Sequence, residues 1–104
     1  YEDVLERIGD EKAIRGFVIR FLDDQSYFTT IQALCGRDFG TAFHAAHTLK
    51  GISQNLGFGR LGKSGAILAE ILRNGIEPPE EMVRQFEMDY RCVTEAIKKL
   101  KSTE

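Results

Sequence analysis

Residues 38–56, DFGTAFHAAHTLKGISQNL, carry the helical pattern from which the fold class of this chain is inferred. Asp38 is a residue type suited to the N-cap of a helix, and an α-helix turns by about 100° per residue. With that rotation the small or apolar side chains of the stretch share one face, and they are Ala42, Ala46, Leu49, Ser53 and Leu56. The stretch therefore predicts an amphipathic helix that buries this face in a core.

The chain before this stretch shows the same helical periodicity. A short helix is expected over residues 2–8, followed by Gly9. Asp10 can then cap a second helix, which is expected to be long, bent at the polar insert 23–26, and to end near Gly36. Its apolar positions keep a spacing of three and four across the insert; they are Ile14, Phe17, Val18, Phe21, Phe28, Ile31, Leu34 and Cys35.

The chain after this stretch predicts two further helices. Gly57 and Gly59 interrupt the chain, and the next helix stops at Asn74-Gly75. Its apolar residues are Leu61, Leu68, Ile71 and Leu72. Pro79 precedes the last helix, whose apolar seam is Val83, Phe86, Tyr90, Val93, Ile97 and Leu100. The pattern predicts one all-α domain over residues 1–104, an antiparallel four-helix bundle with a short additional N-terminal helix.

Composition excludes several classes of function. The 104 residues are 42% hydrophobic and 29% charged, with a net charge of −2 and no basic stripe of the kind that nucleic-acid binders carry. No apolar run approaches the length of a transmembrane helix, and no signal peptide is visible at Tyr1. Cys35 and Cys92 are expected to be free, buried thiols. These features predict a cytoplasmic protein without direct membrane or nucleic-acid contact.

The chemistry is expected on the outer face of the helix at Asp38–Leu56. His47 points away from the apolar side, and within about 60° of it lie Gly40, Phe43, His44, Lys50, Gly51 and Gln54. Glycine in mid-helix costs about 1 kcal/mol relative to alanine, so Gly51 suggests a need for open space above His47. A neutral imidazole is a competent nucleophile near pH 7.

Two neighbours of His47 suit an anionic group on the imidazole. Lys50, three residues on, can offset the charge of phosphoryl oxygens, and Gln54 can donate an amide hydrogen bond to the phosphoryl group or to the imidazole.

The segment 46–51, AHTLKG, with Leu56-Gly57 and Leu61 after it, resembles the signature of the histidine-containing phosphotransfer (HPt) domain. That signature is H-x-L-K-G, four variable residues, an aliphatic residue with glycine, and a leucine shortly after. The segment 17–21 also resembles the second helix of the family. Ile52 and Ser53 depart from the small pair often found after K-G, and Gly62 and Gly65 are expected to loosen the fourth helix.

This resemblance implies a monomeric phosphoryl carrier that is phosphorylated on His47 and does not bind ATP or act as a kinase by itself. The donor would be the aspartyl phosphate of a response-regulator receiver domain, or a sensor or hybrid histidine kinase, and the acceptor another receiver. The receiver would supply Mg²⁺, and this chain would need no cofactor of its own. Phe43, Gly51 and His44 would contribute to a small, transient docking surface.

Two other functions compete with this interpretation. His44 and His47 form an H-x-x-H pair that could ligate zinc or iron, although inward-facing carboxylates at matching positions are missing. The domain could also be a non-catalytic helical interaction module that docks to a receiver or kinase without transferring phosphate.

Overall fold

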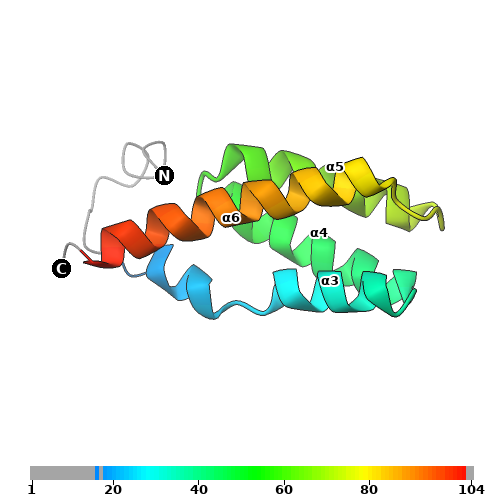
Figure 1. Ribbon diagram of the computed structural model, residues 1–104, viewed down its shortest axis with the longest axis horizontal. Coiled ribbons are helices and arrows are strands. Elements are labelled where there is room, and N and C mark those ends of the chain that lie inside the picture. The colour runs from blue at the N-terminus through cyan, green and yellow to red at the C-terminus, as the bar shows by residue number, and fades with distance from the viewer. Residues whose placement is uncertain (1–15, 17, 103–104) are drawn as a thin grey trace.

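The computed structural model, drawn in Figure 1, describes residue 16 and residues 18–102, without the side chains of 101 and 102. Its elements are a 3₁₀ turn, η1, and four α-helices. They are η1 (Phe21–Asp23), α3 (Ser26–Cys35), α4 (Phe39–Asn55), α5 (Gly59–Arg73) and α6 (Glu80–Ser102). The predicted all-α four-helix bundle is confirmed. The short helix expected over 2–8, the cap at Asp10, and Phe17 lie outside the described residues.

Short turns make successive helices antiparallel, and α4 lies at the centre of the arrangement (Figure 1). It packs against both α3 and α5, and α5 in turn packs against α6. Its predicted inner face is confirmed, since Ala42, Ala46 and Ser53 are fully buried and Leu49 is 1% exposed. None of the helices in the described part of the chain combines the length and the apolar character that crossing a bilayer requires.

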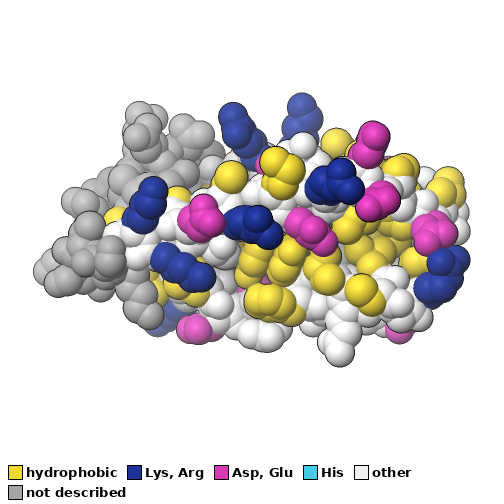
Figure 2. Space-filling view, in the orientation of Figure 1, with side chains coloured by type: hydrophobic (Ala, Val, Ile, Leu, Met, Phe, Trp, Pro, Cys, Tyr) yellow, Lys and Arg dark blue, Asp and Glu magenta, His cyan; other side chains and the backbone are white. Residues whose placement is uncertain are grey.

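Aromatic side chains close the bundle between α3 and α6. The ring of Tyr27 stacks on that of Tyr90 with 3.7 Å between centroids, and Phe86 lies 5.5 Å from Tyr27. Burial raises the pKa of the Tyr27 and Tyr90 phenols, which are neutral at pH 7 even at the ordinary pKa of a phenol. Figure 2 shows apolar side chains along this seam and no histidine on this side of the molecule.

The long second helix is interrupted rather than bent. Asp24 takes an extended conformation with ψ 133°, and its Oδ1 accepts a hydrogen bond of 2.8 Å from the backbone N–H of Ser26. A carboxylate that binds a nearby backbone N–H in this way competes with helix continuation. The break resets the helical phase, so Phe28 is 54% exposed and Cys35 lies on the same outer face.

The prediction for the cysteines was half wrong. Cys35 and Cys92 are free, as expected, but both are exposed rather than buried. Cys35 is the last residue of α3. Cys92 lies on α6 and lines a cavity with Val18 and Ile97, but it is exposed and is not among the buried residues of that helix. Neither thiol therefore belongs to the core.

The ends of α4 follow their predicted chemistry. Asp38 is the N-cap, its Oδ1 accepting from the backbone N–H of Thr41 at 3.2 Å and its Oδ2 from the Thr41 hydroxyl at 2.7 Å. These hydrogen bonds lower the pKa of the Asp38 carboxyl, with the side-chain bond as the larger cause. Gly57 has φ 77°, a conformation that favours glycine, and it turns the chain toward α5. Gly59, expected to interrupt the chain, is the first residue of α5.

Gly62 and Gly65 of α5 allow this helix to approach α4 closely. The sequence had predicted only that these two glycines would loosen the helix. A Cβ at Gly62 would lie 3.1 Å from Cγ of Gln54, and one at Gly65 would lie 3.6 Å from Cβ of Lys50 and 3.7 Å from Cε1 of Phe86. Both glycines are buried. They let α4 lie directly on the backbone of α5, which holds the outer face of α4 in a fixed position.

We expect Gly65→Ala to stabilise the bundle and Gly65→Leu to destabilise it. The alanine methyl would meet Lys50 and Phe86 at ordinary contact distances, so the helix-propensity gain of about 1 kcal/mol remains. Leucine would overpack the same interface, which typically costs about 1–3 kcal/mol. Urea unfolding measures both. Gly62→Ala should gain less than Gly65→Ala because Gln54 must move, and an equal gain would contradict the close approach at Gly62.

Candidate functional site

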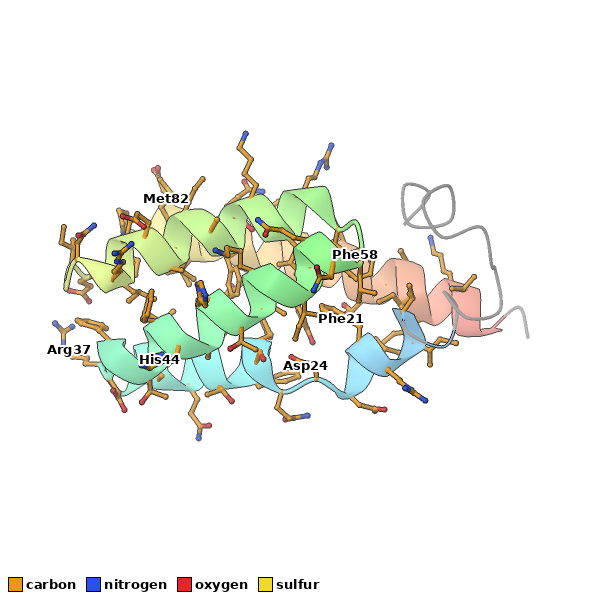
Figure 3. The ribbon with its side chains drawn as sticks, turned by 180° about the vertical axis from the view of Figure 1, so that it is seen from behind. Phe21, Asp24, Arg37, His44, Phe58 and Met82 are labelled. Carbon is orange, nitrogen blue, oxygen red and sulfur yellow. The ribbon has the colours of Figure 1, made fainter. Side chains whose placement is uncertain are left out.

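The outer face of α4 carries His47, which is exposed, on the side opposite the buried Ala46 and Leu49. Figure 3, in which the molecule is seen from behind, brings α4 to the front and labels its other histidine, His44. The sequence prediction for the orientation of this face is therefore confirmed. An exposed imidazole on a well-packed helix is accessible to a partner while its backbone stays fixed.

Phe43 supports both imidazoles of this face. Its ring lies 5.8 Å from that of His47 at an interplanar angle of 29°, and 5.2 Å from that of His44 at 59°. Stacking on a half-buried phenyl ring restricts the rotation of the His47 side chain.

Lys50 is half-buried rather than fully turned to solvent as the sequence suggested. Its Cβ lies 3.6 Å from where a Cβ at Gly65 would be, so the start of its side chain rests on the α5 backbone. A lysine can pack its aliphatic stem in this way and still keep the ammonium group in water. Lys50 therefore packs its aliphatic stem against α5, and its side chain borders the same hollow as His47.

Gly51 has open space where a side chain would start. A Cβ built on it meets no atom within 4 Å outside its own helical backbone. No packing within the described residues therefore explains a glycine at this position of α4, and its role in leaving space near His47 stays a prediction.

Gln54 lies further along α4, about 10 Å from His47 along the helix axis. Its Cγ packs over Gly62 of α5. The structure thus brings Gln54 to the interface with α5 and does not place it in the immediate surroundings of His47.

Two hollows flank the histidines. One of about 390 Å³ lies between α4 and α5, and His47 and Lys50 line it together with Phe43, Ala66, Ala69, Glu70 and Arg73. The other, about 440 Å³, lies between α4 and the start of α3, and His44 lines it together with Asp24, Gln25, Ser26, Thr29, Thr41, Ala45 and Thr48. His44 and His47 therefore face different hollows, although their H-x-x-H spacing had suggested that they could ligate one metal ion together.

Arg73 and Glu70 were missed by the sequence analysis. They lie on one face of α5 with residues 66 and 69. The spacing of these positions predicts a shared helical face, but it does not predict that this face lies beside His47. A cavity of about 220 Å³ lies between Val18, Phe58 and Ile97, and no residue around His47 lines it. Within the part of the chain that the structure describes, no three His, Cys, Asp or Glu side chains group as a metal site would require.

Comparison with known proteins gives one match. The family model described as the Hpt domain matches residues 21–103 of the 104. The searches of curated proteins and of solved structures returned no match.

Proposed function

Because the chain belongs to the Hpt domain family, we propose that His47 is the residue that accepts and donates the phosphoryl group. Membership makes the chain a phosphoryl carrier in a phosphorelay rather than a kinase, and it implies interaction with receiver domains or kinases. The observation that supports His47 is its position: an exposed imidazole opposite the buried face of α4, with Lys50 and an open Gly51 beside it.

The proposed reaction is a reversible exchange between a nitrogen and a carboxylate. An imidazole nitrogen of His47 attacks the phosphorus of an aspartyl phosphate, the P–O bond to the aspartate breaks, and the carboxylate leaves as the new P–N bond forms. The reverse exchange delivers the phosphoryl group to the aspartate of another receiver, or a kinase phosphohistidine serves as donor. The partner receiver would contribute Mg²⁺, and α4 contributes a positioned nucleophile and nearby positive charge.

The same proposal covers the setting of the reaction. The chain would act as a cytoplasmic, monomeric domain that docks transiently through the exposed surface around His47. Phe43 and His44 support this surface, because the phenyl ring contacts both imidazoles.

The test is transfer of a labelled phosphoryl group from phosphorylated receiver domains of the same genome, followed by mapping of the modified residue by mass spectrometry. We expect an acid-labile, base-stable label on His47. A label on His44 would contradict the assignment. Stable docking to a receiver without any label on the chain would instead identify a non-catalytic interaction module.

Lys50→Met is expected to slow transfer by about threefold to tenfold while leaving the thermal midpoint nearly unchanged. Methionine keeps an aliphatic stem against Gly65 but removes the charge that would face the phosphoryl oxygens. Lys50→Arg, which keeps the charge, is the matched control and should retain most of the rate. Equal rates for Lys50→Met and the unmodified chain would show that the Lys50 charge is not used.

A further inference from the structure

The hollow between α4 and α5 is lined by charged side chains from both helices. His47 and Lys50 line it from α4, and Arg73 and Glu70 line it from α5. The remaining α5 residues of the hollow are Ala66 and Ala69. These small side chains leave space beside the imidazole, and the charged groups surround that space.

The pairing of Arg73 with Glu70 is loose. Its closest N–O distance is 3.9 Å, which is too long for a hydrogen bond, and the two side chains are 69% and 65% exposed. Elsewhere on the molecule, Arg84 donates a hydrogen bond of 3.1 Å to Glu80 at the related i,i+4 spacing. The donors of the Arg73 guanidinium are therefore not engaged by the Glu70 carboxylate and can reorient at little expense.

We infer that Arg73 is a second positioning cation for the phosphoryl group on His47, and that Glu70 opposes the arrival of that group. The guanidinium fork matches the geometry of phosphoryl oxygens, which it can bind with two parallel hydrogen bonds. Lys50 approaches the same space from α4 as a point charge. When the phosphoryl group arrives, Arg73 turns from Glu70 to its oxygens, and the Glu70 carboxylate is left facing solvent.

This inference rests on the proposed function, since it requires a phosphoryl group on His47. The inference predicts a result that differs from the result expected for an ion pair with only a structural role. Removing either member of a structural pair has effects of the same sign, whereas here the two members act on an incoming anion with opposite signs. A unit charge about 7 Å away in water changes the energy of a monoanion enough to change its rate by about threefold.

The experiment uses phosphoramidate, a small anionic donor that requires no partner protein. An imidazole nitrogen attacks its phosphorus, the P–N bond to the amino group breaks, and ammonia leaves. We expect Arg73→Ala to slow phosphorylation by about threefold and Glu70→Gln to accelerate it by about twofold. Arg73→Lys should recover part of the rate. All of these differences should shrink in 1 M salt, where the Debye length is about 3 Å.

Arg84→Ala and Glu80→Gln on α6 are the matched controls, since they break an exposed ion pair that does not line the hollow. Their rates should equal that of the unmodified chain. Unchanged rates in both α5 variants, or changes of the same sign, would overturn the inference while leaving His47 phosphorylated. Label that persists in His47→Gln, or no label on the unmodified chain, would overturn the proposed function itself and the inference with it.

Discussion

Replacing His47 by glutamine is expected to reduce phosphoryl acceptance to background. Glutamine keeps a polar side chain on α4 but supplies an amide nitrogen that is not a nucleophile at neutral pH. Because His47 is exposed and contacts mainly the Phe43 ring, the free energy of unfolding should change by less than about 0.5 kcal/mol. Loss of label with an unchanged urea midpoint would therefore assign the chemistry to this side chain rather than to the fold.

His44→Gln is the matched control for that experiment. His44 is on the same helix, is exposed, and packs against the same phenyl ring, but it faces the other hollow. With phosphoramidate as donor the label should persist in this variant. If labelling disappeared in His44→Gln and persisted in His47→Gln, the two histidines would have to exchange roles.

Gly51→Leu is expected to separate stability from function. The helix gains about 0.8 kcal/mol from leucine in place of glycine, and the side chain starts in open space. Leucine side chains in helices lie over the preceding turn, which here carries His47. The thermal midpoint should therefore rise by about 3–6 °C while transfer from a receiver falls by at least about tenfold.

The size of the donor provides the control for Gly51→Leu. Phosphoramidate is small and should label this variant with a smaller loss of rate than a receiver domain, which must dock across the whole surface. Gly51→Ala should raise the thermal midpoint with a lesser effect on transfer. A Gly51→Leu variant that is more stable and transfers phosphate at the normal rate would refute the role of Gly51 in access.

Much of the bundle was predictable from local chemistry. The inner face of α4, its cap at Asp38, the stop at Asn74-Gly75 and the buried Phe86 of α6 all agree with the sequence. Each depends on helical periodicity or on a residue that favours a helix end, and both are properties of a few consecutive residues. The place of His47 on the outer face follows from the same rotation of about 100° per residue.

The wrong prediction for the second helix has a local physical cause. Asp24 binds the backbone of Ser26 and breaks the second helix, and that local competition shifts Phe28 and Cys35 to the outside. The periodicity alone gave no sign of it, because apolar spacing can continue across a break. The role of Gly65 could not be predicted from the sequence, which indicates only that a glycine weakens a helix. The structure shows that this glycine allows close contact with Lys50.

By itself, the sequence determined that the chain is helical, which side of α4 is buried, and that His47 with Lys50 and Gly51 resembles a phosphotransfer site. The packing of the helices shows, in addition, that Arg73 and Glu70 border the same hollow as His47, and that His44 borders a different one. Periodicity fixes the rotation of one helix about its own axis. Which residues of a second helix complete the site depends on how α5 packs against α4, and that packing involves contacts between residues far apart in the chain.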